Sequence, residues 1–232
     1  MSGGIGTKNE SSLHRALKFQ YAGETGSTEY AVGEYVCDGI TPGGDYIEIQ
    51  TGSFGPLKQK IPVLAAWGPV RIIHPIFSAK YIETFDEAGN LLRRRKSGRK
   101  GTAWDLFKAL LYAPELPLVP NVSVELVMVD VAEKRITDGR GSWRRQGTSI
   151  VDREILARHE TVLLRRLKDY LLFVPFTARE AFTVRDLAGR ADIDENTARK
   201  CLYVLARLGL VRRTGKTGRW LTYQKGGPLP AP

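Results

Sequence analysis

Two acidic residues near the start of the chain are spaced so that they could hold a divalent cation. Asp38 and Glu48 lie in the stretch CDGITPGGDYIEIQ, residues 37–50, on either side of a Thr-Pro-Gly-Gly segment. If that segment turns a hairpin about Gly43, Asp38 stands opposite Glu48. Opposed carboxylates repel each other unless a cation neutralises them, and carboxylate oxygens suit Mg²⁺ or Mn²⁺. The spacing predicts a metal site; the alternative is an ordinary hairpin with polar residues on its solvent face.

Further polar residues could complete such a site. Gln50 shares a strand face with Glu48, because strand side chains alternate and Ile47 and Ile49 then point into the core. Glu34 is four residues before Asp38 and is expected on the same face as a third acid. Two weaker candidates are Glu29 and, on the preceding helix, His14.

The surrounding pattern alternates between helix and strand. We expect a helix over 12–22 capped by Ser11 or Ser12, a hairpin over 30–40 and 45–52, a helix over 56–66 and a buried strand over 70–77. A second hairpin over 80–96, a helix over 102–113, a strand over 122–132, a basic loop over 135–150 and a helix over 163–175 follow. This order predicts an α/β core with a mixed sheet flanked by helices.

The N-terminal part resembles the PD-(D/E)xK nuclease superfamily over residues 12–76. Asp38 matches the family's strand-end Asp and Glu48 its acidic position, while Gln50 replaces the family's Lys, as it does in some restriction endonucleases of that superfamily. The resemblance implies a restriction-endonuclease-like core and Mg²⁺- or Mn²⁺-dependent hydrolysis of phosphodiesters. It makes Asp38, Glu48 and Gln50 the expected catalytic residues, with Glu34 as an additional acid.

The missing lysine has two candidate replacements in this resemblance. Some members of the superfamily carry their lysine on the following helix, where this chain has Lys58 and Lys60. The two are alternatives, because residues two apart on a helix do not share a face.

The charge of the whole chain favours a nucleic-acid partner. The 232 residues include 35 Lys and Arg against 25 Asp and Glu, for a formal charge of +10. A run without acids, residues 93–101, carries a cluster expected to contact phosphates: Arg93, Arg94, Arg95, Lys96, Arg99 and Lys100. Arg140, Arg144 and Arg145 around Trp143 form a second basic loop. We expect DNA as the partner, with RNA as an open alternative.

The C-terminal part resembles a winged helix-turn-helix domain. Helices over 184–190 and 194–208, the second with Asp194 as its N-cap, are followed by a strand, a Gly-Lys-Thr-Gly turn and another strand. In that family the second helix enters the major groove and the wing meets the backbone. The resemblance assigns groove contacts to Asn196, Thr197, Arg199 and Lys200, and wing contacts to Arg212, Arg213, Lys216 and Arg219.

The expected organisation is a flexible tail over 1–11, a nuclease-like domain over 12–150, a connecting helix region over 151–178, a small winged-helix domain over 179–226 and a tail over 227–232. No run of about 18 apolar residues and no secretory leader pattern occurs, so a cytoplasmic protein without membrane contacts is expected. Cys37 and Cys201 lack the spacing of a zinc site.

Two functions follow from these patterns. The first is a metal-dependent DNA endonuclease targeted by its winged helix, acting as a homodimer or within a larger complex. The alternative is a non-catalytic DNA-binding protein or regulator, or a complex subunit, that keeps a degenerate nuclease fold; an RNA-processing role is a third reading.

Overall fold

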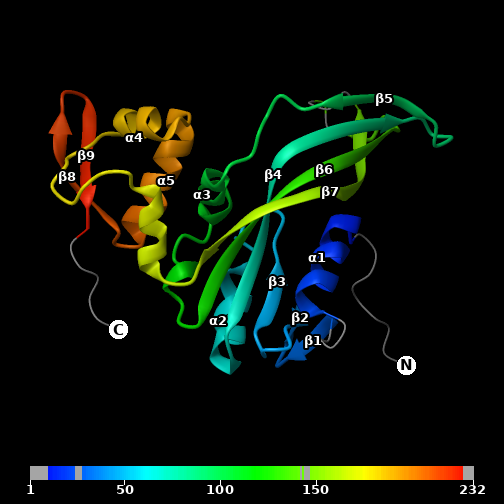
Figure 1. The fold of residues 1–232 in the computed structure, drawn as a ribbon, viewed down its shortest axis with the longest axis horizontal. Helices are drawn as coiled ribbons and strands as arrows, with labels where there is room; N and C mark the ends of the chain where they lie inside the picture. Colours follow the sequence, from blue (N-terminus) through cyan, green and yellow to red (C-terminus); the bar gives the residue numbers. More distant parts are fainter. Residues whose placement is uncertain (1–9, 24–27, 142, 144–146, 227–232) are drawn as a thin grey trace.

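The computed structural model describes residues 10–23, 28–141, 143 and 147–226 (Figure 1). Most of the tails expected over 1–11 and 227–232, together with Arg144 and Arg145 of the expected basic loop, lie outside these residues. In the described part of the chain, no helix is long and apolar enough to cross a membrane.

A mixed seven-stranded sheet forms the body of the protein. Its order is β1-β2-β3-β4-β6-β7, and β5 pairs with β4 beyond the end of β3. β4 runs parallel to β3 and to β6, and the other pairs are antiparallel. The strands are Thr28–Val32 (β1), Tyr35–Ile40 (β2), Tyr46–Ile49 (β3), Val70–Phe85 (β4), Leu91–Lys96 (β5), Val122–Thr137 (β6) and Thr148–Leu164 (β7).

Helices cover both faces of this sheet, which confirms the expected α/β layering. On one face, Leu13 and Leu17 of α1 (Ser12–Ala22) pack with Ile49 and Ile73. On the other face lie α2 (Leu57–Trp67), the 3₁₀ turn η1 (Ala103–Asp105) and α3 (Leu106–Leu110), whose apolar residues share a core with alternate β4 residues. Burial on both faces accounts for the near-continuous apolar sequence of β4.

Two of the expected boundaries are wrong. Residues 30–40 are not one strand, because the chain reverses at Gly33, whose φ of 58° favours glycine, and β1 and β2 form their own hairpin. The helix expected over 102–113 begins as a 3₁₀ turn and ends at Leu110. At its start, the Asp105 carboxylate accepts a hydrogen bond from the backbone N–H of Thr102 and so fixes the beginning of the 3₁₀ turn.

The connecting helix expected over 163–175 is present only in part, as a shorter helix of another type. β7 extends to Leu164 and pairs with β6 along its length, so the two strands take up both ends of the basic loop expected over 135–150. The short helix that follows is a 3₁₀ helix, η4 (Leu167–Phe173), which begins where Asp169 accepts from the backbone N–H groups of Arg165 and Arg166. Polar and apolar residues occur in short runs along β7 and do not alternate, so its sequence gives no period-two strand signal.

The C-terminal part is a pair of helices followed by a hairpin. α4 (Val184–Ala191) and α5 (Glu195–Arg207) precede β8 (Val211–Thr217) and β9 (Trp220–Lys225). Asp194 caps α5 as expected, accepting from the backbone N–H of Thr197 at 3.0 Å. These elements lie beside α3 at one end of the molecule, while β4 to β7 extend toward the opposite end (Figure 1).

The core continues without interruption from the sheet into the helix pair. Phe173 of η4 is 1% exposed, and its ring meets those of Phe107 and Trp104 at centroid distances of 4.8 and 5.1 Å. The same apolar cluster includes Leu202 and Leu205 of α5. An ion pair between Arg207 and Glu115 joins α5 to the turn (Leu116–Leu118, η2) that precedes β6. The helix pair is therefore packed onto the body rather than tethered to it.

Phe173→Ala should lower the free energy of unfolding of the whole chain by about 3–5 kcal/mol, because it leaves a cavity where three aromatic rings meet. Urea unfolding followed by circular dichroism measures this loss. Leu172→Ala is the matched control, since Leu172 is 53% exposed in the same turn. Equal stability of the two variants would contradict the continuous core.

Candidate active site

Asp38 and Glu48 lie where two strands separate. The pairs Gly39↔Ile47 and Ile40↔Tyr46 have the predicted hairpin register, but the ladder between β2 and β3 ends there. Asp38 therefore does not face Glu48 as a paired strand neighbour, which corrects that expectation. Its Oδ2 atom instead accepts a hydrogen bond from the backbone N–H of Ile49 at 2.7 Å. The side chain spans the opening and satisfies a backbone donor that the ladder leaves unpaired.

Cations from α1 surround the Asp38 carboxylate. His14 Nε2 lies 3.2 Å from Oδ2, and Lys18 Nζ lies 3.6 Å from Oδ1. Burial acts to raise the pKa of Asp38, but the hydrogen bond and charge of His14, the Ile49 N–H and the charge of Lys18 outweigh it, so the pKa is lowered. Asp38 is thus held as a carboxylate.

His14 and Lys18 share a second acid, Glu10. Glu10 Oε1 lies 2.6 Å from His14 Nδ1 and 2.9 Å from Lys18 Nζ. Burial acts to lower the pKa of His14, but its contacts with Asp38 and Glu10 raise it overall. His14 was a weak candidate from the sequence, and Lys18 and Glu10 were missed. Their spacing of four residues, which places side chains on one helix face, was the available signal.

Glu48 is buried, with 6% of its surface exposed, and carries a lysine partner. Lys60 Nζ lies 2.7 Å from Oε1, to which it donates a hydrogen bond, and 2.6 Å from Oε2. Burial and the nearby charge of Asp38 nonetheless raise the pKa of Glu48 to about 7, against the lowering effect of Lys60. Of the two predicted replacement lysines, Lys60 reaches the acid pair, whereas Lys58 is exposed on another face of α2.

Gln50 turns away from the acids and shapes the following loop. Its side-chain amide donates to the carbonyl of Ser53, its backbone N–H donates to the Ile73 carbonyl at 2.9 Å, and its own carbonyl lies 2.5 Å from Nδ1 of His74. Burial lowers the pKa of His74, so the neutral ring is favoured and Nδ1 donates to Gln50. Gln50 therefore fixes the chain directly after the acid pair instead of presenting its amide there.

The structure does not bring the other predicted acids to the pair. Glu34 lies exposed in the turn between β1 and β2, not on the strand face of Asp38. Glu29 is exposed and pairs with Lys18, whose Nζ lies 3.3 Å from Glu29 Oε1. No group of three or more His, Cys, Asp or Glu side chains with metal-binding geometry occurs among the described residues.

The donors that remain still suit a hard cation. The carboxylates of Asp38 and Glu48 are close enough for the charge of Asp38 to raise the pKa of Glu48, and the Ile49 carbonyl lies 3.2 Å from His14 Nε2, which also contacts Asp38. All three groups are oxygen donors. Mg²⁺ in proteins is commonly held through one or two carboxylates and otherwise by water and substrate oxygens. The residues therefore fit such an ion, provided that it displaces Lys60 from at least one Glu48 oxygen.

The predicted phosphate-contacting residues form separate basic surfaces. Residues 93–96 lie on β5 and are exposed; Arg94 and Lys96 stack on Tyr81 at 5.3 and 5.6 Å, and Arg94 pairs with Glu83 at 3.3 Å. The next two basic residues, at 99 and 100, are also exposed and follow the strand. Residues 93–96 thus lie on a strand paired only with β4, whereas Arg99 and Lys100 line a cavity shared with α5.

The residues predicted for groove contacts divide between two environments. Arg199 is exposed and pairs with Glu195 at 2.6 Å. Asn196, Thr197 and Lys200 instead line a cavity shared with the body of the protein. The residues predicted for wing contacts are exposed along the hairpin of β8 and β9: Arg212, Arg213, Lys216 and Arg219.

The raised pKa of Glu48 predicts a decrease in stability with rising pH. Its pKa moves from the usual 4.5 to about 7, so the folded protein keeps a proton that the unfolded chain releases. This contribution is fully present below pH 4.5 and is lost as the pH rises through about 7. Glu48→Gln should remove this pH dependence, at most about 3 kcal/mol, in urea unfolding at a series of pH values. Glu34→Gln is the control, and a wild-type slope in Glu48→Gln would refute the assignment.

Comparison with known proteins places the chain in a family. An uncharacterized protein of Treponema pallidum (strain Nichols) is 26% identical over 227 residues, covering 97% of this chain and 88% of that protein. No solved structure matches the chain. A family described as a domain of unknown function, DUF8091, matches residues 11–165, from the cap of α1 to the end of β7. Since this match covers more than half of the chain, the protein belongs to the DUF8091 family.

Proposed function

We propose that the protein is a metal-dependent phosphodiester hydrolase that acts on DNA. The observation that carries this proposal is the grouping of Asp38, Glu48 and Lys60 where β2 and β3 separate, with Lys60 supplying the positive charge that Gln50 lacks. The order of α1, the β1–β3 hairpins, α2 and the parallel strand β4 agrees with a restriction-endonuclease-like core.

Each residue has a defined task in this proposal. Asp38 and Glu48 hold the ion, which when bound stabilises charge on the phosphate and lowers the pKa of an attacking water. His14 and Lys18 keep Asp38 ionised and fixed in orientation. Without the ion, Lys60 balances the charge of Glu48. Once the ion takes over that role, Lys60 would be free to contact the scissile phosphate or the attacking water.

The C-terminal helix pair and hairpin support a winged-helix role in binding. Their order, the Asp194 cap and the exposed cations of the wing agree with backbone contacts to DNA. A non-catalytic DNA-binding function is the second candidate. The observation that favours it is that side chains already neutralise both carboxylates, with Lys60 on Glu48 and His14 on Asp38.

Cleavage assays separate these two functions. Supercoiled plasmid and single-stranded DNA should be cut in Mg²⁺ or Mn²⁺ and left intact in EDTA. Glu48→Gln and Lys60→Ala should each reduce the rate by about 100-fold or more, as loss of a charge-stabilising group does in other enzymes. Lys58→Ala is the matched control from the same helix. DNA binding without metal-dependent cutting would instead support the non-catalytic function.

Removal of wing cations should weaken DNA binding uniformly across sequences. Removing one cation that binds a phosphate reduces the slope of log affinity against log salt by about 0.9. Arg213→Ala combined with Lys216→Ala should therefore lower the slope by about 2, measured by fluorescence anisotropy on duplex DNA over a range of salt concentrations. An unchanged slope would remove the wing from the interface.

A further inference from the structure

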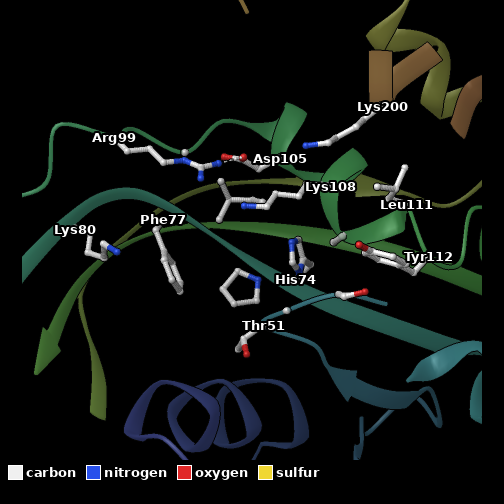
Figure 2. Close-up of a pocket in the computed structure, with 16 residues that line it drawn as sticks. Thr51, His74, Phe77, Lys80, Arg99, Asp105, Lys108, Leu111, Tyr112 and Lys200 are labelled. Carbon is white, nitrogen blue, oxygen red and sulfur yellow. Dashed lines mark hydrogen bonds and ion pairs between the residues drawn. The ribbon is translucent and has the colours of Figure 1, made fainter. Parts of the chain in front are cut away.

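A pocket of about 460 Å³ is lined by the chain that follows Glu48 and Gln50 in sequence (Figure 2). The chain from Thr51 to Ser53, which Gln50 holds in place, forms one wall together with His74. The pocket exists because β4 lacks a strand partner on this edge between Ile73, its last pair with β3, and Tyr81, its first pair with β5. Only a few residues of chain therefore separate Glu48 from the wall of the pocket formed by Thr51 to Ser53.

The opposite wall comes close to β4 without closing the gap. The backbone N–H of Gly101 donates to the Phe77 carbonyl at 2.8 Å, and a Cβ at this glycine would lie 2.6 Å from that oxygen. Only glycine permits this approach, which brings the segment carrying Arg99 over the pocket. α3 then continues the wall.

Cations outnumber acids around the pocket. Lys80, Arg99, Lys108 and Lys200 line it, and Asp105 is the one acid among the lining residues. Asp105 is already paired with Arg99, and Lys80 lies 3.5 Å from Glu133.

Two of these cations are free to bind a ligand. Among the described residues, Lys108 and Lys200 have no acidic partner within 4.0 Å, and Figure 2 shows both extending toward Asp105 and the space beside it. An anionic group would supply the missing partners.

The rest of the lining is apolar and aromatic. Ile76, Phe77 and Leu111 contribute to it, and Tyr112 stands at the rim with 68% of its surface exposed. A pocket of a few hundred Å³ with apolar walls and a few charged groups is typical of small-ligand sites. Aromatic rings beside cations are the features that bind unpaired bases and their phosphates.

The position of α5 limits what can enter. A second cavity of about 490 Å³ shares Arg99, Asp105, Lys108 and Lys200 with the first and reaches Asn196 and Thr197 on α5. The first turns of α5 thus face the body of the protein across this cavity. A cavity of about 490 Å³ has the size of a small-ligand site, which suits one nucleotide of a single strand better than a duplex.

We propose that the pocket takes one unpaired nucleotide of a single-stranded nucleic acid, with its base against Tyr112 and its phosphates on Lys108 and Lys200. The claim that this strand is also the substrate rests on the proposed hydrolase function. The acid pair would then act on a phosphodiester next to the held nucleotide, and the preferred substrate is a single strand or a single-stranded end.

Binding measured in EDTA tests the pocket without any turnover. Fluorescence anisotropy of the full chain with a labelled single-stranded oligonucleotide should show about a tenfold loss of affinity in Tyr112→Ala, as expected for one stacked base. Tyr112→Phe should retain binding because it keeps the ring. Lys108→Ala should also weaken single-strand binding several-fold, while the affinity for duplex DNA of the same sequence changes less than about twofold in each variant.

Two controls match these variants outside the pocket. Lys168→Ala removes an exposed lysine of η4, and Phe19→Ala removes an aromatic ring of α1 that is 67% exposed; both should bind as wild type. Equal losses for single-stranded and duplex DNA, or wild-type binding by Tyr112→Ala and Lys108→Ala, would overturn the proposal. Pocket-dependent binding without cutting in any metal would leave this inference standing and refute the hydrolase; cutting without pocket dependence would do the reverse.

Discussion

The hydrogen bond from the Ile49 N–H to Asp38 is the contact on which the candidate site depends. A longer ladder between β2 and β3 would direct this N–H to a backbone carbonyl and close the space between the strands. The carboxylate ends the ladder after two pairs and thereby places a charged group beside Glu48. The same divergence leaves room for α1 to supply His14 and for α2 to supply Lys60. The Asp38 side chain, by taking the place of a backbone acceptor, thus brings together residues of β2, β3, α1 and α2.

The electrostatics of the pair follow from this arrangement. Two carboxylates buried close together cannot both ionise freely, and their environments separate them: α1 lowers the pKa of Asp38, while burial and its neighbour raise that of Glu48. Lys60 compensates only in part. Because Asp38 is ionised and Glu48 titrates near neutral pH, the charge of the pair can change by one proton when a cation or phosphate arrives, at a modest cost in free energy.

Local chemistry made part of this structure readable from the sequence. The turn about Gly43 set the hairpin register, and the Ser11 and Asp194 caps marked the starts of their helices. The end of the ladder could not be read, because it depends on a side chain competing with the backbone for the Ile49 N–H. The choice of Lys60 over Lys58 required the position of α2 against the sheet. Only the last two residues of β7, Leu163 and Leu164, fell within the helix expected over 163–175, and the runs of polar and apolar residues along β7 gave no period-two signal for a strand.

The continuous core has a consequence for how this chain can be inherited. The DUF8091 match ends at residue 165, and the segment just beyond it contributes the buried rings of Tyr170 and Phe173 to the packing under α3. A recombination break at that point would strip apolar cover from the sheet and leave α5 without its support. An exchange of the helix pair would thus require matching changes in α3 and η4 to keep the shared core packed.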